Sequence, residues 1–316
     1  MTTHLVVGAG PVGTAVAREL VALGHDVVLA SRSGRGVDVP GAVRTALDAS
    51  DAAAVTRLAA GAAVVVNAVN PPDYHRWPQL WPPVAAALLA AAEDAGAVLA
   101  TVSNLYPYGR PTGPMSETSP LQPADVKGEV RLRMWRDALA AHEAGRVRVV
   151  EVRASDFIGA GTGANSHTAR LTRFVLSGRR AQVVGSPDLP HSWTHTVDTA
   201  RTLVAAALDP GAHGRAWHVP TNPPRTQREL AGDLAATAGV PAVPVSGVPT
   251  IALRLAGIGD GRMRAVADSS YQFRTPFVID DTAARARFGL RPTPWADVLE
   301  ATVADVRHEL AAAGAR

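Results

Sequence analysis

Three glycines near the N-terminus have the spacing of a phosphate-binding turn. Gly8, Gly10 and Gly13 follow the apolar run HLVV and open the amphipathic segment PVGTAVARELVALG. The first glycine permits a tight turn, the second lets the backbone approach a pyrophosphate, and the third allows close helix-strand packing, while the helix N-terminus favours anions. The pattern therefore predicts that this turn, with Pro11 and Val12, binds a dinucleotide. The alternative is a tight turn that binds no ligand.

The end of the second predicted strand indicates which dinucleotide binds. An NAD site usually has Asp or Glu there, about 20 residues after the glycines, to accept hydrogen bonds from the ribose hydroxyls. This chain has Ser31 and Arg32 instead. A guanidinium pairs with a 2′-phosphate, and no carboxylate repels it, so NADP(H) is favoured over NAD(H). A solvated Arg32 is the alternative. Asp48 could contact the adenine or cap the next helix.

These residues stand at the ends of short β-branched runs that alternate with alanine-rich segments of helical length. The predicted strands are 4–8, 26–30, 42–46, 63–67, 97–103 and 147–153, and the predicted helices are 11–24, 51–60, 82–95 and 124–144. The alternation predicts an α/β protein with a doubly wound parallel Rossmann sheet, whose ligands bind beyond the carboxyl ends of the strands. Asn67, Ala68 and Val69 end the fourth strand and would lie close to the dinucleotide, although Asn67 could equally bond its own turn.

The second half of the chain indicates a smaller lobe. After residue 158 the alternation loosens, and a helix at 198–208 and a strand at 215–219 indicate a return to the sheet. We predict a Rossmann core of residues 1–158, to which the chain returns at about 190–222, and an interleaved C-terminal substrate cap of residues 159–189 and 223–316.

Composition excludes several other classes of protein. The 316 residues include no cysteine, which excludes disulfides, cysteine-ligated zinc and thiol nucleophiles. The net charge is only +3 and the basic residues are scattered, which gives little support to nucleic-acid binding. No signal sequence or membrane span is evident. We expect a cytoplasmic protein with a small-molecule substrate and no nucleic-acid or membrane partner. The protein could form a homodimer.

Several stretches together resemble the extended short-chain dehydrogenase/reductase superfamily, and more narrowly its atypical members of the NAD-dependent epimerase/dehydratase kind. They are GAGPVG, NAVN, TVSNLYPYG, Lys127, VRASDFIGAG, HTVDTA and FVIDDTAARARFGLRPTP. The resemblance covers nearly the whole chain. It implies the fold and a nicotinamide cofactor. It does not identify the reaction, because this fold hosts epimerases, dehydratases, reductases and redox-silent regulators.

The resemblance also implies a catalytic set, which this chain alters. Members typically use Ser or Thr at the end of the fifth strand and a Tyr-x-x-x-Lys pair on the next helix, where the tyrosine exchanges the proton and the lysine binds the nicotinamide ribose. Asn104 falls at the Ser/Thr position, with Ser103 before it, and Lys127 matches the lysine, but Pro123 replaces the tyrosine. Tyr106 aligns with an acidic catalytic residue of related dehydratases. We hypothesise that Tyr106 supplies the phenol; the alternative is that it packs against the cap.

Other candidates lie on loops that face the same cleft. Ala154 and Ser155 end the sixth strand, where the backbone would pass the nicotinamide. Aromatic, acidic and histidine side chains could contact the substrate, and some could equally be packing residues: Tyr74, His75, Trp77, Asp156, His191 and Tyr271. We expect no metal, because no tight His/Glu spacing typical of zinc sites occurs.

Three functions are compatible with these residues. The favoured one is an NADP(H)-dependent oxidoreductase that reduces a carbonyl or conjugated double bond of a small metabolite. The second is a nucleotide-sugar epimerase or dehydratase, which the arginines of the cap would support: Arg170, Arg173, Arg179 and Arg180. The third is a redox-silent NADP(H)-binding regulatory protein, which the missing tyrosine also fits.

Overall fold

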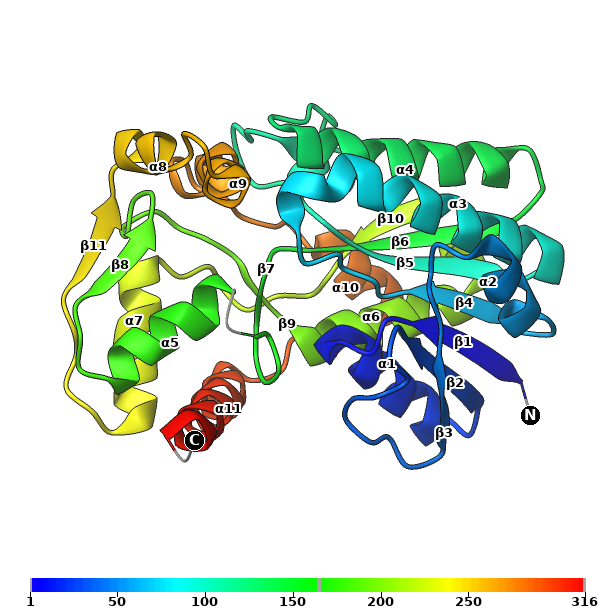
Figure 1. Ribbon diagram of the computed structural model, residues 1–316, viewed down its shortest axis with the longest axis horizontal. Helices are drawn as coiled ribbons and strands as arrows, with labels where there is room; N and C mark the ends of the chain where they lie inside the picture. The colour runs from blue at the N-terminus through cyan, green and yellow to red at the C-terminus, as the bar shows by residue number, and fades with distance from the viewer. Residues whose placement is uncertain (1, 164–165, 315–316) are drawn as a thin grey trace.

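A seven-stranded sheet forms the centre of the computed structural model, which describes residues 2–163 and 166–314. Within these residues all its neighbouring strands are parallel, in the order β10-β6-β5-β4-β1-β2-β3 (Figure 1). The strands are β1 (Thr3–Val7), β2 (Asp26–Ser31), β3 (Ala42–Ala46), β4 (Val64–Asn67), β5 (Val98–Asn104), β6 (Arg148–Ala154) and β10 (Arg215–His218). The chain reverses its direction of travel across the sheet between β1 and β4, and this switch point is where such sheets bind ligands. The predicted fold class is confirmed.

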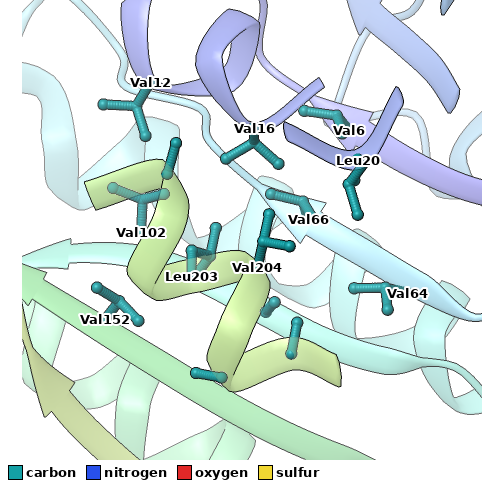
Figure 2. Close-up of a cluster of buried hydrophobic side chains, with 14 of the residues drawn as sticks. Val6, Val12, Val16, Leu20, Val64, Val66, Val102, Val152, Leu203 and Val204 are labelled. Atoms are coloured by element: carbon teal, nitrogen blue, oxygen red, sulfur yellow. The ribbon is translucent and has the colours of Figure 1, made fainter. Parts of the chain in front are cut away.

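Helices cover both faces of this sheet (Figure 1). One face packs against α1 (Pro11–Ala22) and α6 (Thr196–Leu208), and the other against α2 (Ala52–Ala59), α3 (Trp77–Ala95) and α4 (Val126–Glu143). Figure 2 shows the first layer, where Val16 of α1 and Leu203 of α6 meet valines of the strands. Strands buried on both faces need apolar residues at successive positions, which explains their β-branched runs.

The smaller lobe lies beyond the carboxyl ends of β5 and β6 (Figure 1). Its elements are α5 (His167–Leu176), β8 (Ala181–Val184), α7 (Gln227–Ala238), β11 (Val245–Val248), α8 (Thr250–Ala256), α9 (Gly261–Ser269) and α11 (Trp295–Gly314). β8 and β11 pair in parallel, and Leu171, Leu230 and Val298 lie in its hydrophobic core. A short pair, β7 (Asp156–Ile158) with β9 (Trp193–His195), joins this lobe to the sheet. Single 3-10 turns are η1 (Tyr74–Arg76), η2 (Tyr106–Tyr108), η3 (Pro210–Ala212) and η4 (Ser270–Phe273).

Two elements differ from the sequence prediction. α3 begins at Trp77, not at 82, because Trp77 is completely buried and holds a first turn that precedes the prolines at 82 and 83. The helix α10 (Thr282–Phe288) lies in the range predicted for the cap, yet Phe288 packs edge-to-face on Trp217 of β10, with ring centroids 4.9 Å apart. Residues 282–288 therefore belong to the packing of the Rossmann half.

Candidate functional site

The glycine turn has the geometry that a dinucleotide requires. Gly8 has a φ of 109°, and a Cβ there would lie 2.4 Å from the Ala68 carbonyl oxygen, while a Cβ on Gly13 would lie 1.8 Å from the Gly8 carbonyl oxygen. A Cβ on Gly10, in contrast, would have no atom within 4 Å. No side chain caps the N-terminus of α1, which Pro11 opens. Open space and unbonded N–H groups at a helix N-terminus fit a pyrophosphate.

The end of β4 supports this turn through its backbone. The Ala68 N–H donates to the Val7 carbonyl oxygen at 2.8 Å, which places residue 68 beside Gly8. The Asn67 side chain is buried and its Oδ1 accepts from the Val69 N–H at 3.2 Å. In this arrangement the Asn67 amide stabilises its own turn, the alternative that its sequence also allowed.

The adenosine end of the site is an exposed loop. Ser31 Oγ donates to the Arg35 carbonyl oxygen at 3.2 Å, and Arg32 is exposed to solvent. Asp48 accepts from the N–H and hydroxyl of Ser50, which lower the pKa of Asp48, and the charge of Arg32 lowers it further. The residue that caps α2 is Asp51, whose Oδ1 accepts from the Ala54 N–H.

Two tyrosines gather beyond β5 and β6. Burial raises the pKa of Tyr106 well above its usual value, and the neighbouring Tyr74, Asp156, Tyr271 and Asp125 raise it further. Tyr271, from η4, is 3% exposed, and its hydroxyl has no hydrogen-bond partner in the described residues. Burial, followed by Asp125 and Asp156, also raises the pKa of Tyr271. Both phenols therefore stay protonated at neutral pH and can donate a hydrogen bond.

Lys127 joins α4 to α9. Its ammonium lies 3.3 Å from Asp125 Oδ2 and donates to the Ala265 carbonyl oxygen of α9 at 2.6 Å. Asp125 also caps α4 through the Gly128 N–H, and its Oδ2 accepts from Ser269 Oγ at 3.3 Å. Burial lowers the pKa of Lys127, which the Asp125 charge opposes. The lysine therefore has partners in this structure, and its predicted contact with the nicotinamide ribose stays a prediction.

A carboxylate and an imidazole form a short pair at the start of β7. His191 Nε2 lies 2.7 Å from Asp156 Oδ2 and 3.5 Å from Ser155 Oγ. The His191 ring stacks on Phe273, with centroids 4.6 Å apart and planes 12° apart. Burial raises the pKa of Asp156, but the hydrogen bond and charge of His191 outweigh it and hold that pKa below its usual value. We call Tyr106, Asp125, Lys127, Asp156, His191 and Tyr271 the site cluster.

The predicted residues at the ends of β5 and β6 differ in burial and in hydrogen bonding. Asn104 Oδ1 accepts from the Tyr106 N–H at 3.1 Å, so its amide orients the turn that carries the phenol. Ser103 is buried with no partner for its hydroxyl in the described residues. Ala154 is buried at the end of β6, and the Ser155 N–H donates to Thr194 Oγ1 at 3.0 Å. Ser103 and Asn104 are the last two residues of β5, Ala154 is the last residue of β6 and Ser155 follows it. Their predicted roles stay predictions.

The aromatic loop after β4 forms one wall of the site. Trp77 is completely buried, its Nε1 donates to the Pro71 carbonyl oxygen, and Tyr74 stacks on its ring. His75 is exposed and packs against the start of α9, because a Cβ on Gly261 would lie 3.1 Å from its ring. Trp77 is therefore a packing residue, whereas Tyr74 and His75 remain accessible.

Arg131 is a residue that the sequence reading missed. Its guanidinium lies 4.1 Å from the ring centroid of Trp81 and 5.0 Å from that of Trp77, and burial lowers its pKa to about 10. Two features of the sequence could have indicated this contact: Arg131 lies one helical turn after Lys127, and Trp77 and Trp81 are four residues apart. Cation–π contacts of this kind stabilise a desolvated arginine, so Arg131 supports the wall beneath Tyr74 and Tyr106.

The arginines of the smaller lobe do not form one cluster. Arg173 pairs with Glu309, Arg170 is exposed near His167, and Arg179 and Arg180 are exposed after α5. Within residues 2–163 and 166–314, no group of three or more acidic or histidine side chains could hold a metal ion. No helix of the same residues has the length and hydropathy needed to cross a membrane.

Comparison with models of protein families shows which family this chain belongs to. The family model described as the NAD dependent epimerase/dehydratase family matches residues 4–219. The chain belongs to this family. The match confirms the resemblance seen in the sequence and spans β1 to β10, together with the site residues on those strands. A search of curated proteins finds no match.

Solved structures of this fold include several nucleotide-sugar enzymes. MoeE5 in complex with UDP-glucose and NAD is 21% identical, with a TM-score of 0.79 over 98% of this chain and 100% of that one. UDP-glucuronic acid 4-epimerase from Bacillus cereus, with UDP-glucuronic acid and NAD, is 17% identical, with a TM-score of 0.79 over 98% and 100%. A double mutant of DesIV, the dTDP-glucose 4,6-dehydratase of Streptomyces venezuelae, with NAD bound, is 20% identical, with a TM-score of 0.78 over 98% of both chains. At these identities the likeness establishes the fold.

The comparison overturns the predicted preference for NADP(H). All three of these neighbours were solved with NAD. The prediction depended on Arg32, but a guanidinium also donates to hydroxyl groups, so its presence does not require a 2′-phosphate. In this structure Arg32 is exposed, and its charge acts on Asp48, a carboxylate that the prediction did not weigh against it.

Proposed function

We propose that this protein is an NAD-dependent enzyme that oxidises a hydroxyl-bearing carbon of a nucleotide sugar and uses the ketone for epimerisation or dehydration. The observation that carries the proposal is the site cluster, which gathers two phenols and a carboxylate–imidazole pair beyond β5 and β6. Polyhydroxylated substrates need such convergent hydrogen-bonding groups. Family membership and the nucleotide-sugar ligands of the structural neighbours support the same substrate class.

The cofactor and the chain would divide the chemistry. NAD+, when bound, supplies the hydride acceptor. Gly8, Gly10 and Gly13 would hold its pyrophosphate, and Asp48 would face the adenosine end. The protonated phenols of Tyr106 and Tyr271 would donate hydrogen bonds to the substrate oxygen that becomes the ketone, which stabilises charge as it develops there.

Product analysis tests this function. The purified protein would be incubated with NAD+ and a panel of UDP- and dTDP-hexoses, and the products would be identified by mass spectrometry and NMR. We expect either an epimer of unchanged mass or a product lighter by one water. Gly13→Ala is the control, because it removes the cofactor site. NAD binding without turnover of any hexose in the panel would contradict the proposal and favour a redox-silent regulatory protein.

A further inference from the structure

We propose that Asp156 is the catalytic proton acceptor of this enzyme and that His191 is the residue that positions it. The inference rests on the proposed function, because it assigns a role within that reaction. It answers a question that the missing tyrosine at position 123 leaves open, namely which group takes the proton from the substrate hydroxyl.

The tyrosines of the site cluster cannot take that proton. The raised pKa values of Tyr106 and Tyr271 keep both as phenols, which are donors at neutral pH and lack the phenolate that a base requires. Asp125 is also committed, because its carboxylate is occupied by Lys127, the Gly128 N–H and Ser269 Oγ. Within the described residues, Asp156 remains the ionised group of the cluster with an unoccupied oxygen.

Asp156 is also the accessible member of its pair. Its side chain is 20% exposed, whereas that of His191 is 2% exposed. Oδ2 is bonded to His191 Nε2, and no other group in the described part of the chain bonds the carboxylate. Because only Ser155 separates Asp156 from the carboxyl end of β6, the carboxylate lies near the end of the sheet where ligands of this fold bind.

His191 is held in one tautomer by its surroundings. A separation of 2.7 Å requires a proton between Nε2 and Oδ2, and the low pKa of Asp156 places that proton on the imidazole. Nδ1 is buried with no partner in the described residues, so a proton there would be an unsatisfied buried donor, whereas a proton on Nε2 is bonded by Asp156. Phe273 fixes the ring plane by stacking. His191 thus donates to Asp156 and keeps it ionised.

The proton transfer balances with the NAD+ of the proposed function as the oxidant. The substrate O–H bond would break as an Oδ1–H bond forms on Asp156, and the electron pair left on oxygen would form the C=O bond as the C–H bond breaks. NAD+, when bound, would accept the hydride. The same carboxylic acid returns the proton when the ketone is reduced. His191 keeps its hydrogen bond to Oδ2 throughout and takes up no proton from the substrate.

Several titratable groups face Asp156 and enter its pH dependence. They come from the loop before β9, from α5, from η2 and from η4: His191, His167, Tyr106 and Tyr271. The charge of Arg170 lowers the pKa of His167. Within this set, His191 is the group that bonds Asp156, so its removal should dominate any change.

Paired substitutions test the catalytic role. Asp156→Asn should lower kcat by about 10²–10⁴-fold, the usual contribution of a general base, with little change in NAD affinity. Asp94→Asn, an exposed aspartate at the end of α3, is the matched control and should behave as wild type. Wild-type kcat in Asp156→Asn would overturn the proposal while leaving the proposed function intact.

A pH profile and a titration test the positioning role. His191→Phe keeps the stack on Phe273 but loses the donor, so the acidic limb of kcat/KM should move to higher pH, and His191→Gln should restore it in part. A ¹³C NMR titration of the Asp156 carboxyl needs no substrate, and in His191→Phe its midpoint should rise above the usual value of about 3.9, because burial then acts without the opposing hydrogen bond. An unchanged midpoint would overturn the proposal whether or not any hexose reacts; absence of products in the wild type bears on the proposed function instead.

Discussion

Two polar clusters lie beside one another on the central sheet, and they differ in how completely their groups are paired. The buried network consists of Tyr108, Glu117, Glu151, Arg153 and His218. Arg153 bonds Glu151 at 2.7 Å and the Tyr108 hydroxyl at 2.8 Å. That hydroxyl also bonds His218 Nε2 at 2.8 Å, and Glu117 accepts from the His218 N–H. Every member of this network has at least one partner within the protein, and among the described residues Arg153 Nη2 is its one buried side-chain atom without a partner.

The site cluster is paired less completely. The Tyr271 hydroxyl and His191 Nδ1 have no partner in the described residues, and Asp156 uses one oxygen. Buried polar groups are nearly always bonded in folded proteins, so unpaired ones indicate a ligand or water. Tyr106 and Tyr108 show the contrast within one turn, because the first faces the site cluster and the second closes the buried network. We therefore expect the network to stabilise the fold and the site cluster to contribute to ligand binding.

Removal of Arg153 should have the largest effect on stability. Arg153→Met would leave the buried Glu151 without its ion-pair partner, which costs about 3–5 kcal/mol. Although burial opposes its charge, Glu151 and Tyr108 raise the pKa of Arg153, so it is a cation in the fold. Chemical denaturation gives the free energy of unfolding. The control is Arg133→Met, since its pair with Asp137 is exposed and should contribute less than about 1 kcal/mol. Equal losses would erase the contrast between paired and exposed charges.

A pair of helix glycines extends the comparison to the backbone. Gly13→Ala should weaken NAD binding at least about a hundredfold, or about 2.7 kcal/mol, because its Cβ would displace the Gly8 carbonyl. Gly232→Ala, in the interior of α7, meets no atom within 4 Å and should stabilise the protein by about 1 kcal/mol. Calorimetric titration with NAD and denaturation measure the two effects. Normal NAD affinity in Gly13→Ala would refute the role of close packing at this turn.

Two tyrosine-to-phenylalanine changes test the contrast directly. Tyr108→Phe should lower the free energy of unfolding by about 1–3 kcal/mol, because Arg153 and His218 both lose a partner. Tyr271→Phe removes a buried hydroxyl that has no partner in the described residues, so stability should not fall and should rise by up to about 1–3 kcal/mol while turnover of the substrate falls. Denaturation and steady-state kinetics distinguish them. If the two variants exchanged these effects, the assignment of the clusters would be reversed.

His4 shows that a missing partner alone does not identify a site. It is buried near the amino end of β1, whereas ligands of this fold bind at the carboxyl ends of the strands. Burial, and then the charge of His25, lower the pKa of His4 to about 4. Below its unfolded pKa of about 6.5 the unfolded chain binds the extra proton, so stability should fall as the pH drops toward 4. The loss at pH 5.5 should be about 1 kcal/mol. Thermal denaturation of His4→Leu across this range should lack that part of the dependence.

The strands and the glycine turn were predictable because their signals are local. Each predicted strand ends within one residue of the observed one, since β-branched runs between turns leave little choice of register. The start of α3 was mispredicted because the prolines at 82 and 83 resemble an N-terminal turn, whereas the burial of Trp77 extends the helix. The cofactor prediction depended on the charge of Arg32 alone, and the structural neighbours solved with NAD overturn it.

The sequence by itself determined the parallel sheet, the glycine turn and the family, because each is the sum of local signals, strand runs, turns and short motifs, repeated along the chain. Only the tertiary structure decided how Tyr106, Asp156 and Tyr271 meet. These three residues come from η2, β7 and η4, and their convergence depends on how the smaller lobe packs across the sheet edge. No local pattern encodes that packing, because burial and electrostatic coupling arise from neighbours that lie more than a hundred residues apart in the chain.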